Sequence, residues 1–447
     1  MSLITDLDER DADALLSRLA YFAQAADPFL VAPAAGKNPT PPQSALKIIV
    51  FKRRKDFARV VNNRHFAAYT QPELAGTNLI VGPDGTGGHL QNTLHEYVHY
   101  RLRTHSQAYP VWYEEGLATL LSNTQFFDEA TPPYAEVGRD LPRNLKRSQA
   151  EAPRMRALLR RSNFDGLDWG GMTGFYRRSA ELVQYLLFDP ETRTANIAAL
   201  NAHLADRSKP LTELLDTNSK RLNRNVNWYV RKKRKAVTTV ELSPVADLAV
   251  TRRELPASEA TRLVAETARP ANPRYAAGLY SELLEADPDN IDLLAALVDA
   301  QRSFEPDTAA ANLARAITLA PDHPAVLMQQ ALTLLQECPL DATLTCLEQW
   351  REAPRYIRAA LAKDPQHFNA ILWLGITELY GANPGRAVDY LRIAHHRAPW
   401  SPKVNYHLGE CLRLLGNPRG RAHLQQALLW ANEPVVRELA QKSLALY

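Results

Sequence analysis

Four proline-containing pairs recur at a nearly constant interval in the second half of the chain, and they constrain its fold more than any other feature. Successive prolines are 33, 44 and 34 residues apart. A period in this range indicates stacked copies of one helical unit, and the longer middle interval indicates an insertion of about ten residues in that copy. The pairs are Asp287-Pro288, Ala320-Pro321, Asp364-Pro365 and Ala398-Pro399.

Small residues occupy the positions of the best copy where two helices must cross closely, and a proline ends its second helix. The copy resembles a tetratricopeptide repeat, although Ile371 stands where that family has its leading tryptophan. Another copy is weaker, with Leu297 in the glycine position. The matching residues are Leu374, Gly375, Ala387, Leu391, Ala394 and Pro399.

The resemblance implies an all-α solenoid over residues 257–447, with about four to five helix pairs and residues 434–447 as a capping helix. It also implies that this domain binds a protein partner. Residues 236–256 change in character and are expected to form an extended linker.

The first part of the chain, residues 1–235, mixes helical and strand patterns without a regular alternation. Helices are expected near 6–25, 89–104, 110–122, 174–188, 194–205 and 211–232, and strands near 46–51, 66–69 and 77–81. Ser2–Thr5 resembles the end of a further strand. This order predicts an α+β domain with a small mixed sheet.

One helix carries the pattern His95-Glu96-Tyr97-Val98-His99. Because His95 and His99 are four residues apart, their imidazoles lie on one helical face and can reach one tetrahedral Zn²⁺. Glu96 can face the open position of the metal and act as general base toward a metal-activated water. Only three positions define this pattern, so a third ligand has to decide between a zinc site and coincidence.

Two residues compete for the third ligand. His105 stands six residues after His99, the spacing of metzincins, but Leu102 occupies the place of the glycine that their turn requires. Glu115 follows Pro110 on the next expected helix, so its carboxylate can approach the first helix. The adjacent Glu114 is expected to be a solvated acid at the start of that helix.

The segment Trp112-Tyr-Glu-Glu-Gly-Leu-Ala118 resembles the Trp-Leu-x-Glu-Gly-x-Ala segment of gluzincin peptidases, in which the glutamate is the third zinc ligand. The resemblance places that role on Glu115. More closely, residues 1–232 resemble bacterial peptidase-MA-like domains, which precede tetratricopeptide repeats. This likeness implies a zincin-like catalytic domain with an active-site helix and one Zn²⁺ per chain, held by His95, His99 and Glu115.

The same resemblance extends to the segment at 175–187, where Tyr176 matches the family pattern and Ala180 replaces a tryptophan. Gluzincins often use a tyrosine hydroxyl to stabilise the oxyanion of the reaction, and by that analogy Tyr176 is the candidate. The strand at 77–81 is expected to be the edge of the sheet, where an extended peptide could add as a further strand.

The motifs together predict a zinc metallopeptidase that hydrolyses peptide bonds with Glu96 as general base, and whose repeats bind a partner or substrate protein. The alternative is an inactive peptidase-like domain within a repeat scaffold. The presence of both histidines, Glu96 and Glu115 favours the enzyme.

Charge and hydropathy limit the other partners. The net charge is +4 over 447 residues, too small to indicate nucleic acid, and no apolar stretch is long enough to span a bilayer. The basic run Arg231-Lys-Lys-Arg-Lys235 is interpreted as a solvated helix end, with a localisation signal or an anion-binding patch as alternatives.

The compartment follows from the N-terminus and the cysteines. The acidic N-terminus predicts a cytoplasmic protein, or a periplasmic or secreted one if an N-terminal segment has been removed. The three cysteines, Cys338, Cys346 and Cys411, are expected to be buried thiols, with a Cys338–Cys346 bridge left open.

Overall fold

The computed structural model divides the chain into two units, each described by itself. Unit 1 comprises Met1–Lys52, Ala67–Gln71 and Thr77–Ala249, and unit 2 comprises Arg53–Phe66, Pro72–Gly76 and Val250–Tyr447. The structure describes residues 1–447 except 31–44, 64–65, 74–75, 84–87, 104–108, 143–144, 146–149, 165, 233–234, 246–249, 337, 339–345 and 432–433.

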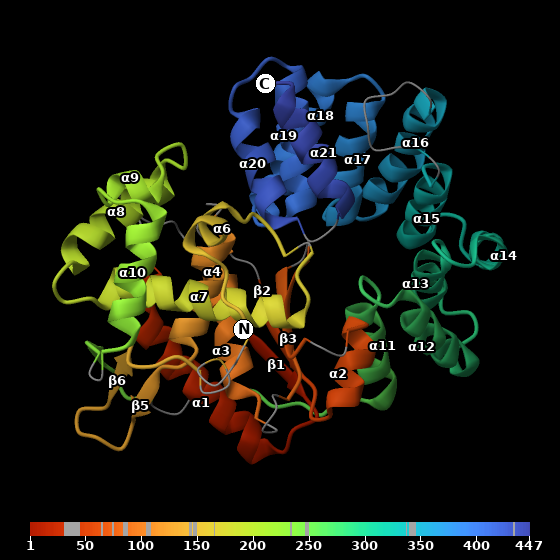
Figure 1. The fold of residues 1–447 in the computed structure, drawn as a ribbon. Helices are drawn as coiled ribbons and strands as arrows, with labels where there is room; N and C mark the ends of the chain where they lie inside the picture. The colour runs from red at the N-terminus through yellow and green to blue at the C-terminus, as the bar shows by residue number, and fades with distance from the viewer. Residues whose placement is uncertain are drawn as a thin grey trace. The chain divides into compact units, whose positions relative to one another are not determined.

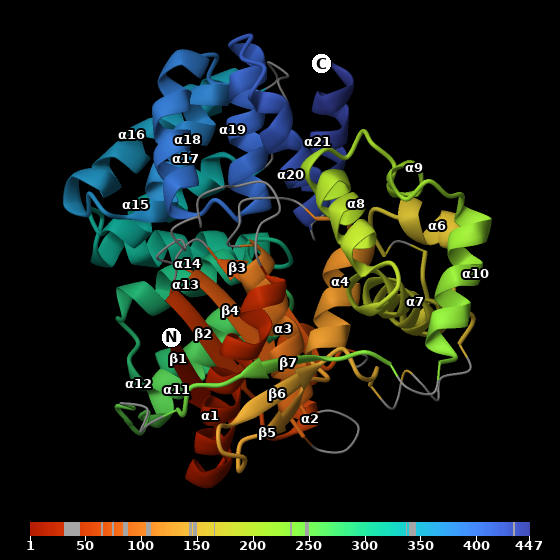
Figure 2. The same ribbon diagram turned by 90° about the vertical axis from the view of Figure 1, so that its left-hand side faces the viewer.

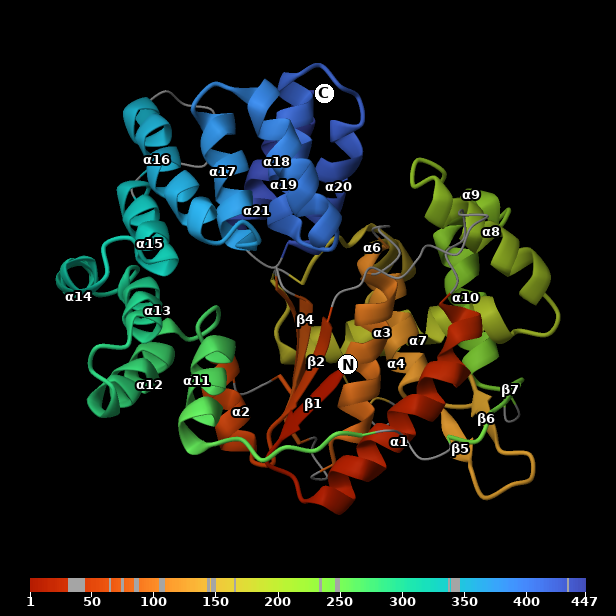
Figure 3. The same ribbon diagram turned by 180° about the vertical axis from the view of Figure 1, so that it is seen from behind.

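A four-stranded sheet with the order β1-β2-β4-β3 is the first element of unit 1 (Figure 3). The first strand pairs in parallel with the second, so the strand expected at Ser2–Thr5 is present. Apolar residues such as Ile48, Val50 and Leu79 are buried in this sheet, as their sequence pattern predicts. The strands are β1 (Ser2–Thr5), β2 (Ala45–Val50), β3 (Ala68–Glu73) and β4 (Gly76–Val81).

Helices pack against this sheet and share one hydrophobic core with it. The first helix is capped by Asp8, whose side chain accepts a hydrogen bond from the backbone N–H of Asp11 at 3.0 Å. Figures 2 and 3 show α4 (Val111–Leu121) lying beside α3 (Leu90–Arg103) and beside α7 (Trp169–Phe188). The main helices of unit 1 are α1 (Glu9–Ala26), α3 (Leu90–Arg103), α4 (Val111–Leu121), α6 (Met155–Arg160), α7 (Trp169–Phe188), α8 (Arg193–Ala205), α9 (Leu211–Leu214) and α10 (Ser219–Val230), with a short 3-10 turn η1 (Asp27–Phe29).

Three details of unit 1 differ from the sequence expectations. Part of the expected linker 236–256 forms a strand, because Thr238–Glu241 (β7) completes an antiparallel sheet with β5 (Gln125–Phe127) and β6 (Tyr134–Val137). The segment expected as one helix at 211–232 forms two, α9 and α10. The strand at 77–81 is internal, since β4 lies between β2 and β3; the two edge strands are β3 and, at the other end of the order, β1.

Unit 2 consists mainly of helices that follow one another as consecutive pairs, from green to blue in Figure 1. Each proline of the sequence period lies just after the second helix of a pair, where it cannot continue that helix. This arrangement is that of a tetratricopeptide-like solenoid. The helices are α11 (Ala257–Ala268), α12 (Pro273–Ala286), α13 (Ile291–Gln301), α14 (Pro306–Leu319), α15 (Pro324–Leu334), α16 (Leu347–Lys363), α17 (Phe368–Tyr380), α18 (Pro384–Arg397), α19 (Pro402–Leu414), α20 (Gly420–Trp430) and α21 (Pro434–Ala445).

Glycines allow the paired helices of the best copies to approach each other. A Cβ added at Gly375 would lie 2.8 Å from Cγ of Leu391, and one added at Gly409 would lie 2.8 Å from Cγ of Leu424. Both distances are shorter than an ordinary van der Waals contact, so a larger side chain would push the helices apart. The small residue found by the repeat pattern is therefore required by packing.

A helix from the first part of the chain also belongs to unit 2. Helix α2 (Arg54–Val61) lies beside α11, as Figures 1 and 3 show. The side-chain amide of Asn272 donates to the backbone carbonyl of Arg59 at 2.7 Å. Phe57 and Val60 are buried, so the apolar face of α2 is covered.

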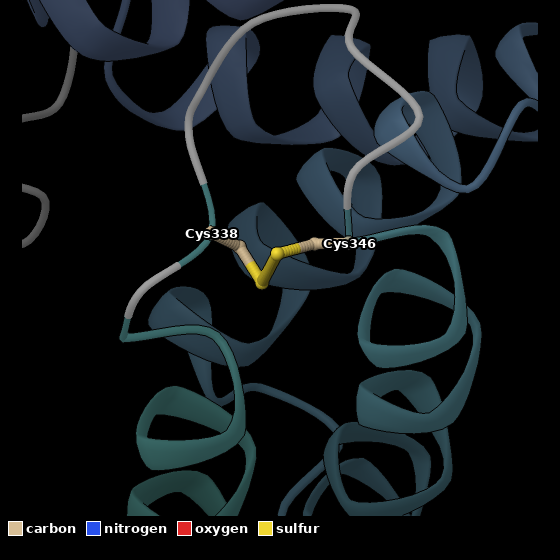
Figure 4. Close-up of a disulfide and its surroundings, with 2 residues drawn as sticks. All are labelled: Cys338 and Cys346. Carbon is tan, nitrogen blue, oxygen red and sulfur yellow. A yellow bond between two sulfur atoms is a disulfide. The ribbon is translucent and has the colours of Figure 1, made fainter.

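The insertion found from the sequence period lies between α15 and α16, and a disulfide joins its ends. Cys338 and Cys346 are bonded, with their Cα atoms 5.6 Å apart (Figure 4). The expectation of buried thiols is therefore wrong for these two residues, because the two helices bring them within bonding distance. It is right for Cys411, which is free and buried.

Among the described helices, none combines the length and the apolar character that a membrane span requires.

Candidate metal centre

The two histidines of the sequence motif lie on one face of α3. That helix forms because Leu94, Val98 and Leu102 recur at helical spacing and are buried in the core of unit 1. The ring centroids of His95 and His99 are 4.9 Å apart, and their Nε2 atoms are 3.2 Å apart. The i, i+4 spacing therefore brings both imidazoles to one point, as predicted.

Glu115 reaches the same point from α4. Oε2 of its carboxylate is 3.3 Å from Nε2 of His95 and 3.4 Å from Nε2 of His99. Helix α4 begins after Pro110, and its apolar residues, among them Trp112 and Leu117, are fully buried, so its position beside α3 is fixed.

Gly116 explains how α4 can lie so close to α7. A Cβ at this position would lie 2.5 Å from the carbonyl oxygen of Ser179 and 2.7 Å from Cγ2 of Val183. Such contacts are too short, so only glycine allows this approach. The glycine next to Glu115 thus sets the position of that carboxylate relative to α7, which carries Tyr176.

The three donor atoms form a nearly equilateral triangle with sides of 3.2, 3.3 and 3.4 Å. Zn–N and Zn–O bonds of about 2.0–2.1 Å in a tetrahedral site place ligand atoms roughly 3.3–3.4 Å apart. His95, His99 and Glu115 also form the group among the described residues whose ligand atoms could hold a metal ion. The donor set therefore fits a tetrahedral Zn²⁺ with one position left for another ligand.

Burial and charge favour a cation at this triangle. Burial alone would lower the pKa of His99, but attraction and hydrogen bonding from Glu115 outweigh it and raise this pKa to about 9. Burial alone would raise the pKa of the Glu115 carboxyl, but the charges and hydrogen bonds of His99 and His95 hold it well below its usual value. Glu115 is thus a carboxylate near neutral pH, the form that ligates a divalent cation.

Glu114 differs from its expected role as a solvated acid. Its side chain is only 12% exposed, and Oε2 lies 3.9 Å from Nδ1 of His99. At that distance the carboxylate makes no hydrogen bond to the ring, and its negative charge adds to those that raise the pKa of His99. The sequence does not reveal that Glu114 is buried near His99, because an acid at the start of a helix gives no sign that the helix begins inside the domain.

Glu96 is held by a residue that sequence reasoning misses. The hydroxyl of Thr70, on the edge strand β3, donates to Oε2 of Glu96, and both side chains are buried. This hydrogen bond joins the expected general base to the edge of the sheet. A lone threonine in a strand pattern gives no signal of such a contact.

Tyr176 lies beside the histidines. Its ring centroid is 6.3 Å from that of His95. Burial raises the pKa of Tyr176 well above its usual value, and the charges of Glu115 and Glu96 raise it further. The phenol therefore stays protonated at every pH near neutrality and can donate a hydrogen bond.

The structure thus brings together His95, His99, Glu115, Glu96 and Tyr176. The competing ligand His105 lies outside the described residues.

Comparison with known proteins adds information about fold only. No protein-family model matches the chain, and no curated protein sequence matches it. Solved structures that resemble it include a thermophilic TPR protein of Thermus thermophilus, with 16% identity, a TM-score of 0.35, and coverage of 42% of this chain and 100% of that one. PilW, a type IV pilus biogenesis factor, has 20% identity and a TM-score of 0.33, and the match covers 43% of this chain and 88% of that one.

A third neighbour is MamA from Desulfovibrio magneticus RS-1, with 17% identity, a TM-score of 0.28, and coverage of 41% of this chain and 96% of that one. These neighbours are consistent with a tetratricopeptide-like region. At such scores the likeness carries no weight by itself, and the assignment rests on the paired helices and their proline period.

Proposed function

We propose that the chain is a zinc-dependent peptidase with a gluzincin-type site in a zincin-like domain. The observation that carries this proposal is the triangle of donor atoms from His95, His99 and Glu115, whose sides match the edges of a tetrahedral zinc site. Two imidazoles and a carboxylate are the ligands of known catalytic zinc sites that keep one position open.

The residues around the triangle have distinct tasks. A Zn²⁺ held there would supply Lewis-acid polarisation of a carbonyl and would acidify a water. Glu96 accepts a proton and later returns it to the leaving amine, and Thr70 fixes the orientation of its carboxylate. Tyr176 donates its hydroxyl proton as a hydrogen bond to the negative charge that develops on the carbonyl oxygen.

The edge strand supports a peptide as substrate. Because β3 rather than β4 is at the end of the sheet order, an extended chain would add to β3. Thr70 belongs to this strand and contacts Glu96. A peptide aligned on β3 would therefore lie beside the general base.

The repeats are proposed to bind a protein, either the substrate or a regulator. Stacked helix pairs present a long surface built from many similar positions, which suits a peptide or helix as partner. The net charge of +4 gives no support for nucleic acid.

Metal analysis joined to a cleavage assay tests the enzymatic part. We expect one Zn²⁺ per purified chain and hydrolysis of members of a peptide library. Glu96→Gln should keep the zinc and lose hydrolysis, whereas Glu129→Gln, the same change at an exposed acid, should keep both. Unchanged hydrolysis in Glu96→Gln would show that the proposed mechanism is wrong.

The third ligand is decided by two further variants. Glu115→Ala should release the metal, and His105→Ala should retain it. Release by His105→Ala alone would support the metzincin-like alternative. A chain purified without stoichiometric zinc and without hydrolysis would support the scaffold alternative.

The disulfide bears on the compartment. Structural disulfides persist in oxidising surroundings and are rare in the cytosol. The Cys338–Cys346 bond therefore favours a periplasmic or secreted location over the cytoplasm. Alkylation of the unfolded chain from cell extracts, without reduction, should label Cys411 alone; labelling of all three cysteines would place the chain in a reducing compartment.

A further inference from the structure

One cavity of unit 1 is not lined by any of the proposed metal ligands and has a volume of about 1000 Å³ and a strongly cationic lining. Six cationic and two acidic side chains line it, so positive charges outnumber negative ones in the lining by four. Two of the cations, Lys232 and Lys235, belong to the basic run for which the sequence favours a solvated helix end. We call this cavity the cationic pocket; its charged lining residues are Arg139, Arg154, Arg177, Arg178, Lys232, Lys235, Asp140 and Glu181.

One wall of the cationic pocket is the loop that holds Arg139. Gly138 has a φ of +94°, and a Cβ there would collide with the ring of Phe188, so the loop has little freedom. The buried amide of Gln184 donates to the carbonyl of Gly138 at 2.6 Å, and Lys235 donates to Oε1 of the same amide at 3.0 Å. Gln184 therefore fixes cationic groups from two segments at once.

A second wall is the segment before α6, which lies tightly against α7. A Cβ at Gly174, on α7, would lie 2.1 Å from the carbonyl oxygen of Glu151. Only glycine allows so close an approach, and the segment that holds Arg154 is therefore fixed in place.

Helices α7 and α10 complete the lining. Arg178, on α7, is only 4% exposed; it donates to Glu181 at 2.7 Å and to Oδ1 of Asn223, on α10, at 2.6 Å. The backbone segments of the pocket and the side chain of Arg178 are thus held in position by the fold.

Three cations of the pocket form ion pairs with carboxylates. Arg178 pairs with Glu181 and Arg139 with Glu136, and Lys232 pairs with Asp189. Their charges are therefore largely neutralised within the fold.

The other three cations of the pocket are Arg177, Lys235 and Arg154. Arg177 and Lys235 donate to uncharged oxygens, the carbonyl of Ala150 and the amide of Gln184. Among the described residues, Arg154 has no side-chain hydrogen bond or ion pair, although it stands at the edge of a formed cavity. The charge of Arg154 is thus not neutralised by any carboxylate of the described residues.

We propose that the cationic pocket binds a small molecule that carries two or more adjacent anionic groups, either phosphates or carboxylates. Several arginines with planar donor groups suit such oxyanions. The volume matches that of pockets for small organic ligands. Among the described residues that line the cavity none is aromatic, so a nucleobase would find no ring to stack on. Arg154 is the cation available for the ligand.

Calorimetric titration of the full chain with inorganic diphosphate and, separately, with citrate tests the proposal. Binding of at least one is expected, with affinity that falls as NaCl is added. Preference for diphosphate assigns phosphates, and preference for citrate assigns carboxylates. Arg154→Gln should weaken binding at least about tenfold because one charge-assisted hydrogen bond is lost.

Two controls locate the binding. Arg224→Gln, which removes an exposed arginine of α10 outside the cationic pocket, should bind as the unchanged chain does. Glu115→Ala should also bind unchanged, because the metal ligands do not line the pocket. Absence of binding by both anions, equal binding by Arg154→Gln and the unchanged chain, or loss of binding in Glu115→Ala would overturn the proposal. None of these results depends on peptidase activity.

Discussion

The proposed metal centre of unit 1 and the repeats of unit 2 both depend on a glycine that lets two helices cross closely, with different results. Gly116 lets α4 approach α7, and Gly375 lets α17 approach α18. In the repeats the close crossing recurs, so each copy supports its neighbours. In unit 1 the crossing places Glu115 and Tyr176 at one point. The same local rule yields a scaffold when it is repeated and a chemical site when it is combined with distant residues.

The largest effect is expected when each of these two glycines is replaced by alanine, because the added methyl group enters the helix crossing. Gly116→Ala would press a Cβ against the backbone of Ser179, which cannot move aside cheaply, so unit 1 should lose about 3 kcal/mol of stability. Zinc content should fall with it. Gly375→Ala meets only side-chain atoms, chiefly those of Leu391, and should cost about 1–2 kcal/mol. Thermal unfolding with metal analysis of both variants provides the measurement.

Zinc retention by Gly375→Ala is the control in that experiment. If Gly116→Ala retained full zinc and stability, the crossing would have no role in positioning Glu115.

Removing the disulfide tests whether a change in the repeats affects only the repeats or also the proposed metal centre. Replacing Cys338 and Cys346 by Ser frees a closed loop of about nine residues, which by the chain-entropy relation should cost roughly 2–3 kcal/mol. The loss should appear in the unfolding of the repeats, followed by denaturant titration. Zinc content should not change. A parallel loss of zinc would show that the metal centre depends on this part of the repeats.

Removing the charge behind His99 tests how far the metal centre extends beyond its three ligands. Glu114→Gln should weaken zinc affinity about 10–100-fold, because the neutral amide no longer places a negative charge behind the ring. Competition with a chelator of known affinity measures the effect. Glu213→Gln, a comparable change at an acid on α9, serves as control, and equal affinities in both variants would return Glu114 to a passive role.

The smallest expected effect concerns Thr70. Thr70→Val keeps the shape of the side chain and removes the hydrogen bond to Glu96, so the orientation of the base is lost while zinc remains. A net value of about 1.5 kcal/mol for a hydrogen bond to a charged group corresponds to roughly a tenfold fall in kcat/KM. Unaltered kinetics with unaltered zinc content would show that Glu96 is oriented by other contacts.

The features that depend on neighbours along the chain can be predicted from the sequence. Asp8 caps the first helix, and the spacing of His95 and His99 brings their imidazoles together, because both properties are local. The proline period locates the repeat helices for the same reason. The place of Glu115 on the next helix makes it a possible ligand, and the resemblance to a family segment assigns it the role of third ligand.

Features that depend on distant pairing cannot be predicted in this way. The segment Thr238–Glu241 is a strand because β6 lies beside it, about a hundred residues earlier in the chain. Thr70 and Glu96 meet through the packing of a sheet against a helix. The Cys338–Cys346 bond requires knowing where α15 ends and α16 begins. In each case the decisive partner is set by tertiary structure.

Helix α2 has a consequence for how such a chain can be recombined. It is encoded between β2 and β3, yet it packs on α11 and belongs to unit 2. The polypeptide therefore passes between the two units at several places, and no single crossover point separates them. Exchange of the repeats for an unrelated array would leave the apolar face of α2, with Phe57 and Val60, without its cover. An exchange of the repeats would therefore have to include α2.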